Sequence, residues 1–149
     1  MKKKLIVLFL CVALLFTFAA CSNNNVATVN GEKITKDEYT EYLNFILAKY
    51  DETYSSYGGL SAQMLQYFDV QDTAINDLVT MEELKQACAE AGCSPTDDEI
   101  QSYVYDYLGV TEKSDYEDAI SDIKTQYGLS EDTTVKIIAS NLYYENLED

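Results

Sequence analysis

The 149-residue chain is acidic, since 26 aspartates and glutamates against 10 lysines and arginines give a net charge of −16 at pH 7. This charge excludes nucleic-acid binding and direct adsorption to anionic lipid, because both require basic patches. The chain has no histidine, which excludes a Ser-His-Asp triad, histidine acid–base catalysis and imidazole metal sites. It also lacks a Gly-rich phosphate loop and EF-hand spacing. We therefore expect no catalytic, cofactor-binding or metal site.

The chain opens with a leader of the secretory type. Three lysines at positions 2–4 precede an almost entirely apolar run at 5–20. As a helix this run would be about 24 Å long, short of the ~30 Å hydrocarbon core of a bilayer. A signal peptide over residues 1–20 is therefore favoured over a membrane-spanning helix.

The leader ends in Phe18-Ala19-Ala20-Cys21, which resembles the lipobox of bacterial lipoproteins. In that family the cysteine is acylated and becomes the mature N-terminus. The resemblance implies lipidation of Cys21, with residues 21–25 as lipidated cysteine and polar tether. Two acyl chains would give a stable anchor at the outer face of the cytoplasmic membrane. The alternative is a plain structural thiol at Cys21.

A β-hairpin and a capped helix follow the tether. Val26–Asn30 alternates as a short strand, the Asn-Gly pair favours a tight turn, and Glu32–Ile34 returns as the second strand. Thr35 then starts a helix, because Glu38 three residues later completes a capping box. Apolar residues at helical spacing continue this helix through Tyr54.

Further helices follow from the same spacing. They are predicted at about 64–68, 72–91, 96–108, 114–127 and 131–147. Capping boxes at Thr96 with Glu99 and at Ser114 with Glu117 mark two of the starts. The fold class is therefore mostly α: residues 26–149 form a small domain of about five to six helices with a short N-terminal β-hairpin.

Three segments resemble the N-terminal domain of the SurA/PrsA foldases. VATVNGEKITKDEY (26–39) before an amphipathic helix is typical of the entry to that domain. LKQACAEAGCSPTDDEI (84–100) resembles its helix, glycine, turn and restart. YGLSEDTTVKIIASNLYYENL (127–147) resembles its closing turn and last helix. The resemblance covers nearly all of the chain after the leader.

In that family the domain helps to hold unfolded secreted chains, often beside a parvulin prolyl isomerase domain whose site uses histidines. This chain ends at Asp149 and contains no histidine. The resemblance therefore implies a chaperone-like protein that binds unfolded or exported polypeptides without ATP and is not an isomerase or another enzyme. The alternative is an envelope adaptor that binds one specific protein partner. A homodimer is a candidate assembly.

Apolar residues outside the predicted core stripes are candidates for client binding. Phe45 and Tyr105 depart from the stripes of their helices, the latter from a stripe that runs from Ile100 to Tyr107. Ile137 and Tyr144, seven residues apart, form a second apolar line on the last helix. This line predicts a contact with a client or, within the molecule, with the hairpin. Single exposed apolar residues are also ordinary. The candidate client-binding residues are Phe45, Met64, Tyr67, Phe68, Tyr105, Ile137 and Tyr144.

Cys88 and Cys93 flank Gly92, which is predicted to end a helix in the left-handed conformation. In a Schellman motif the third residue from the helix end contacts the residue after the glycine. The two thiols should therefore meet. They either form a disulfide outside the cytoplasm or remain two thiols that act as small hydrophobes.

Overall fold

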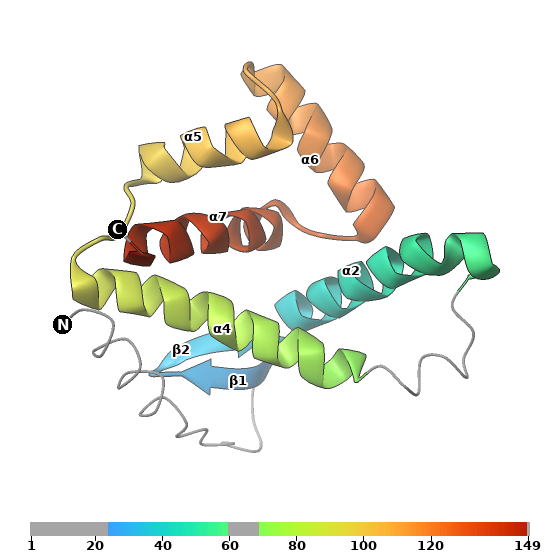
Figure 1. The fold of residues 1–149 in the computed structure, drawn as a ribbon, viewed down its shortest axis with the longest axis horizontal. Coiled ribbons are helices and arrows are strands. Elements are labelled where there is room, and N and C mark those ends of the chain that lie inside the picture. Colours follow the sequence, from blue (N-terminus) through green and yellow to red (C-terminus); the bar gives the residue numbers. More distant parts are fainter. Residues whose placement is uncertain (1–23, 60–68, 149) are drawn as a thin grey trace.

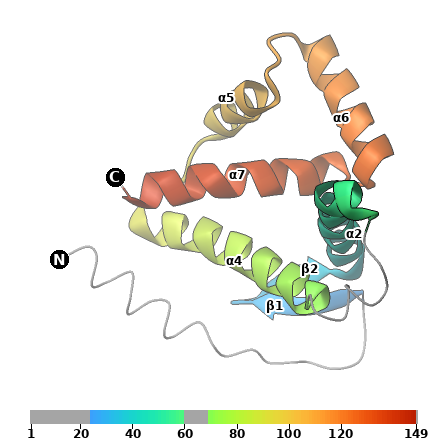
Figure 2. The same cartoon turned by 45° about the vertical axis from the view of Figure 1, so that its right-hand side comes forward.

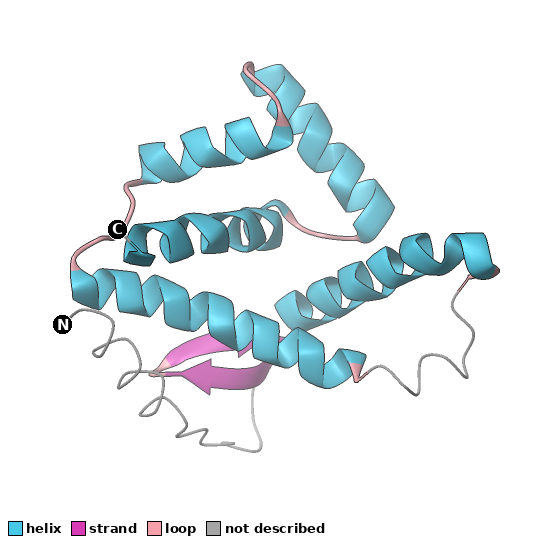
Figure 3. Cartoon of the chain, in the orientation of Figure 1, coloured by secondary structure: helices cyan, strands magenta, loops and turns pink. Residues whose placement is uncertain are grey.

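The structure is a computed structural model that describes residues 24–59 and 69–148. Within these residues the chain forms a two-stranded hairpin, five α-helices and one 3-10 turn (Figures 1 and 3). The predicted fold class is confirmed. The leader, Cys21 and the helix expected at 64–68, with Met64, Tyr67 and Phe68, lie outside the described residues.

The hairpin forms as its sequence predicts. Strand β1 (Asn25–Val29) pairs antiparallel with β2 (Glu32–Thr35). The turn between them is the Asn30-Gly31 pair, with φ angles of 50° and 97°. Positive φ at both positions suits a tight hairpin turn, which asparagine and glycine adopt more readily than other residues.

Helix α2 (Lys36–Tyr54) begins at the predicted capping box. The Thr35 hydroxyl accepts a hydrogen bond from the Glu38 N–H at 3.1 Å, and the Glu38 carboxylate accepts one from the Thr35 N–H at 3.4 Å. The 3-10 turn η1 (Ser55–Tyr57) follows the helix.

Helix α4 (Val70–Ala91) starts slightly earlier than predicted and ends at Gly92, as expected. Asp69 is its N-cap, although its side chain makes no capping hydrogen bond. The main core lies where α4, α2 and the hairpin meet. It consists of Val29, Ile34, Tyr42, Ile46, Ala74, Leu78 and Val79.

Helix α5 (Asp97–Leu108) begins at the predicted Thr96–Glu99 capping box. Helix α6 (Lys113–Tyr127) does not begin at the predicted one, because its N-cap is Glu112. The Glu112 carbonyl accepts a hydrogen bond from the Tyr116 N–H at 3.1 Å, so Ser114 is already inside the first turn. The carboxylate of Glu117, which the motif would aim at the cap, instead pairs with Lys113 at 3.6 Å.

Helix α7 (Glu131–Glu148) forms the centre of the helical array. It packs on α4 along one side and on α5 along the other (Figure 1). Figure 2 shows that the hairpin lies on the side of α4 that faces away from α7. Helix α5 therefore lies beyond α7, away from the main core, whereas the end of α6 reaches back to α2. None of the helices in the described part of the chain is both long and apolar enough to cross a membrane.

Two residues depart from their predicted packing. Tyr107, assigned to the inward stripe of α5, is 63% exposed, and Val104 is the buried residue of that helix. Within the described residues, the larger contacts of α5 are those with α6 and α7. The packed face of α5 is therefore narrower than its apolar stripe predicts. Phe45, expected to point away from the core, packs partly buried against it.

Candidate functional site

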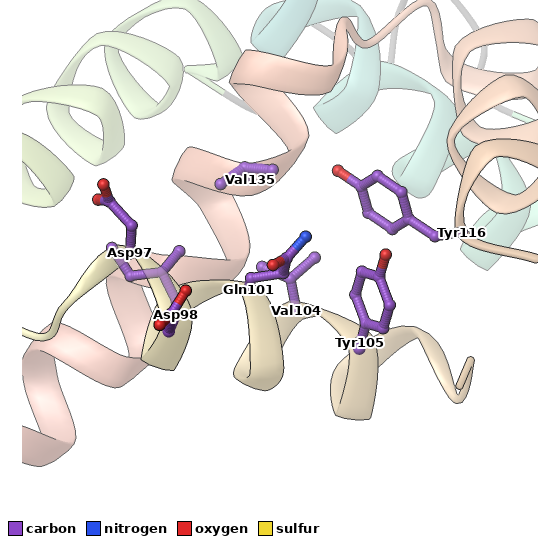
Figure 4. Close-up of a pocket in the computed structure, with 8 residues that line it drawn as sticks. Asp97, Asp98, Gln101, Val104, Tyr105, Tyr116 and Val135 are labelled. Atoms are coloured by element: carbon purple, nitrogen blue, oxygen red, sulfur yellow. The ribbon is translucent and has the colours of Figure 1, made fainter. Parts of the chain in front are cut away.

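A cavity of about 430 Å³ opens between α5, α6 and α7 (Figure 4). Its volume is within the range of small-ligand pockets. Helix α5 supplies most of the wall, and α6 and α7 add one residue each. We call this cavity the groove; it is lined by Asp97, Asp98, Ile100, Gln101, Val104, Tyr105, Tyr116 and Val135.

The helical repeat places the α5 residues on one wall. Asp97, Gln101 and Val104 lie four and seven positions apart, so they share a face of the helix. The capping box at Thr96 fixes where this face begins, since it sets the first turn of α5. Val104 is only 2% exposed and forms an apolar floor. Local sequence at the start of α5 therefore determines which side chains enter the groove.

The end of the groove toward α6 is aromatic. Tyr105 and Tyr116 stack with ring centroids 5.0 Å apart and an interplanar angle of 22°. The Tyr116 hydroxyl donates a hydrogen bond to the Glu131 carboxylate at 2.7 Å. Burial raises the pKa of Tyr116, and Glu131 raises it further. Tyr116 is therefore a neutral phenol at physiological pH, with its ring held against Tyr105.

The other end of the groove is acidic. Figure 4 shows Asp97 and Asp98 at the start of α5, separated from the two tyrosines by Gln101 and Val104. Two carboxylates at a helix N-terminus are favoured by the helix dipole. The groove therefore offers, in order, negative charge, an apolar floor and an aromatic wall. Such an arrangement can bind an extended segment that combines apolar and basic side chains.

An ion-pair junction holds α7, and with it Val135, in place. The Lys136 ammonium lies 2.6 Å from the Glu38 carboxylate on α2 and 3.6 Å from that of Glu82 on α4. Glu82 is only 5% exposed, and a buried charge of this kind requires a partner. The lysine therefore ties α7 to both neighbouring helices.

A second junction lies one turn earlier on α7. The Glu41 carboxylate accepts hydrogen bonds from the Ser130 N–H at 3.0 Å, the Ser130 hydroxyl at 2.7 Å and the Thr133 hydroxyl at 2.6 Å. Burial by itself would raise the pKa of Glu41, but the hydrogen bonds from Thr133 and Ser130 outweigh it and lower that pKa below its usual value. Glu41 thus holds the start of α7 as a carboxylate.

The groove contains one of the residues predicted to bind clients, Tyr105. Phe45 instead contacts Tyr42 and Tyr127, with ring centroids 6.0 and 5.4 Å away. Ile137 packs partly buried against the main core. Tyr144 is 52% exposed on α7, where its hydroxyl donates to Glu148 at 2.8 Å. The last three do not line the groove.

Sequence reasoning missed most of the groove. The predicted site residues did not include Tyr116 and Val135, which follow the helical repeat as core residues do, or Asp97 and Asp98, which are typical of the start of a solvated helix. The usable signal was the mixture of acidic, amide and apolar residues at positions 97, 101 and 104. Among the described residues, no three histidine, cysteine or carboxylate side chains are grouped so that they could hold a metal ion.

Comparison with known proteins defines the class. Foldase protein PrsA from each of two Clostridium perfringens strains is 27% identical to the chain over 137 residues, which is 89% of this chain and 39% of the relative. Foldase protein PrsA from Pediococcus pentosaceus is 54% identical over 41 residues, which is 28% of this chain and 14% of the relative. The chain thus spans well under half the length of these curated relatives. No solved structure matches it.

All three relatives carry the name of a foldase. The family model of the SurA-like N-terminal domain matches residues 1–147. The chain belongs to this family, as the three sequence segments predicted.

Proposed function

We propose that the protein is a chaperone-like lipoprotein that holds unfolded or exported polypeptides in the groove, without ATP and without prolyl isomerase activity. The family supports the chaperone class. The groove is the observation that supports the location of the client-binding site, because acidic, apolar and aromatic surfaces follow one another along α5. A client segment would place an apolar side chain on Val104 and a basic one near Asp97 and Asp98.

The size of the groove favours weak and reversible holding. Burial of one Leu-sized side chain contributes about 1.5–3 kcal/mol, whereas a millimolar dissociation constant already requires about 4 kcal/mol. A single contact therefore releases its client quickly. A client that offers several such segments is held by repeated binding, and its release requires no nucleotide.

We further propose that residues 1–20 are a signal peptide, that residues 21–25 are the lipidated Cys21 and a tether, and that residues 26–149 are the client-binding domain outside the cytoplasm. The sequence of the leader supports this arrangement. Labelling of growing cells with a fatty-acid analogue tests it, since the label should enter the protein and be lost in Cys21→Ser. Label retained in that variant would contradict lipidation of Cys21.

Tyr105→Ser tests the groove. Truncation removes a stacked, half-buried aromatic side chain, so we expect roughly tenfold weaker binding of apolar, lysine-containing peptides and poorer suppression of the aggregation of thermally unfolded citrate synthase. Tyr107→Ser is the matched control, because Tyr107 is on the same helix, is 63% exposed and does not line the groove. Fluorescence anisotropy and light scattering are the measurements, with circular dichroism to confirm folding.

The outcomes separate the alternatives. Equal loss in both variants, or in neither, would place the client site elsewhere. Chemical crosslinking of envelope proteins to the chain should recover several unrelated clients. A single partner, recovered to the exclusion of others, would favour an adaptor instead.

A further inference from the structure

The two cysteines meet at the corner between α4 and α5. Gly92 has a φ of 71°, and the Cys93 N–H donates to the Cys88 carbonyl at 2.9 Å. This is the hydrogen bond of a Schellman motif, and it folds Cys93 back over the last turn of α4. As a result, the Cys88 and Cys93 sulfur atoms lie 2.9 Å apart.

The two thiols differ in their surroundings. Cys88 is fully buried, and its thiol donates a hydrogen bond to the Tyr143 carbonyl on α7 at 3.2 Å. Burial and the contact with Cys93 raise the pKa of Cys88 to about 12. Cys93 is partly exposed. A reagent in solution can therefore reach Cys93, whereas Cys88 can react only with a group that Cys93 presents to it.

We propose that Cys88 and Cys93 are a reversible dithiol–disulfide site, in which Cys93 reacts with an external disulfide and Cys88 resolves the product. The Cys93 thiolate attacks one sulfur of a small disulfide, forms a mixed disulfide and releases one thiolate. That thiolate accepts the proton of Cys88. The Cys88 sulfur then attacks the Cys93 sulfur and expels the second half of the reagent as a thiolate, which takes up the proton that Cys93 released when it ionised. Two protein thiols are oxidised and one external disulfide is reduced to two thiols.

Oxidation of this site would rigidify the turn between α4 and α5, and α5 forms most of the wall of the groove. The Cys93 carbonyl accepts a hydrogen bond from the Asn146 side chain on α7 at 3.0 Å, and the chain then runs directly into α5. A bond between the two sulfurs would close the turn at Gly92 covalently. The proposal rests on the geometry of the corner and does not depend on client binding.

The test is treatment of the purified full chain with oxidised glutathione, followed by denaturing alkylation and peptide mapping. Trypsin leaves both cysteines in one peptide, 86–113, because no lysine or arginine lies between its ends. This peptide is thereby distinguished from the other two cysteines, Cys11 and Cys21. We expect the peptide to lose two hydrogen atoms, to resist alkylation, and to recover both thiols after reduction with dithiothreitol.

Two variants separate the roles of the thiols. In Cys88→Ser the glutathione adduct on Cys93 should persist, because no thiol resolves it; the serine hydroxyl can still donate to the Tyr143 carbonyl. In Cys93→Ser the buried Cys88 should remain unmodified until the protein is denatured. Two free thiols in the oxidant-treated wild-type protein, or a stable adduct on Cys93 there, would overturn the proposal. So would rapid modification of Cys88 in folded Cys93→Ser. If Cys88→Ser does not fold, these last results still decide the question.

Discussion

Glu41 lies in the second turn of α2, yet its carboxylate binds Ser130 and Thr133 at the start of α7, 89 and 92 positions away in sequence. An acceptor that receives several hydrogen bonds stays ionised even when it is partly desolvated. One side chain thereby holds the start of the helix that adds Val135 to the groove. Sequence patterns did not predict this contact, because no local motif relates Glu41 to residues so distant.

Glu41→Gln is expected to make the free energy of unfolding depend less steeply on pH in the acid range. Hydrogen bonds lower the folded-state pKa of Glu41 against the effect of burial. The carboxylate therefore stabilises the fold fully above the unfolded glutamate pKa of about 4.3, and this contribution is lost as the pH falls through the lower folded-state pKa. Urea unfolding across this acid range measures the free energy.

The control for this prediction is Glu117→Gln, which removes a carboxylate that is 64% exposed. Its profile should follow that of the wild-type protein. A Glu41→Gln profile parallel to the wild-type profile over the same pH range would show that the junction does not contribute to acid sensitivity.

Single residues also show where helical periodicity misleads. Phe45 and Tyr105 both depart from the predicted stripe of their helices, yet Phe45 packs on the core and Tyr105 lines the groove. The reason is that α2 packs against neighbours on more than one side, whereas in the described part of the chain the larger contacts of α5 are with α6 and α7. A stripe defines one packed face, but it does not reveal how many neighbours a helix has.

At the scale of elements, the helix starts depend on their first turns. Two predicted capping boxes form as expected, at Thr35 and Thr96. The third does not, because the backbone at Glu112 is already the N-cap and Ser114 falls within the helix. Local chemistry thus predicted most helix starts, and it failed at α6, where two positions separated by one residue could each be the N-cap.

Alanine at the three positions should reveal the difference. Thr35→Ala and Thr96→Ala are each expected to lower the free energy of unfolding by about 1 kcal/mol, because each removes the acceptor for an N–H of the first turn. Ser114→Ala should change it by less than about 0.5 kcal/mol, as an ordinary surface substitution does. Thermal and urea unfolding check all three. If Ser114→Ala lowered the free energy of unfolding as much as Thr96→Ala does, Ser114 would be the N-cap of α6, as the sequence predicted.

At the scale of the whole molecule, the sequence predicted the order and type of the elements but not the groove. Hairpin, helices and glycine ends follow from turn chemistry and periodicity, which act over a few residues. The groove depends instead on how far α5 and α6 lie from α7, and contacts between distant segments, such as the hydrogen bond from Tyr103 on α5 to Glu145 on α7, contribute to that spacing. Patterns within one segment carry no information about that spacing.

Helix α4 should open less readily than α5 and α6. In α4 five residues are buried, whereas α5 and α6 each bury one, Val104 and Ile120. Segments with few buried contacts open at lower free energy. Hydrogen exchange followed by mass spectrometry should therefore show α5 and α6 exchanging well before the centre of α4. Equal protection of α4 and α5 would indicate a single cooperative unit.

The acidic end of the groove has a consequence for ionic strength. At about 0.1 M salt the Debye length is ~10 Å, so the attraction that the net charge of −16 exerts on distant basic clients is largely screened. Asp97 and Asp98 would meet a bound cation at contact distance, where screening is weaker. At low ionic strength the protein therefore attracts any basic chain. At higher ionic strength binding is selective for basic chains that enter the groove.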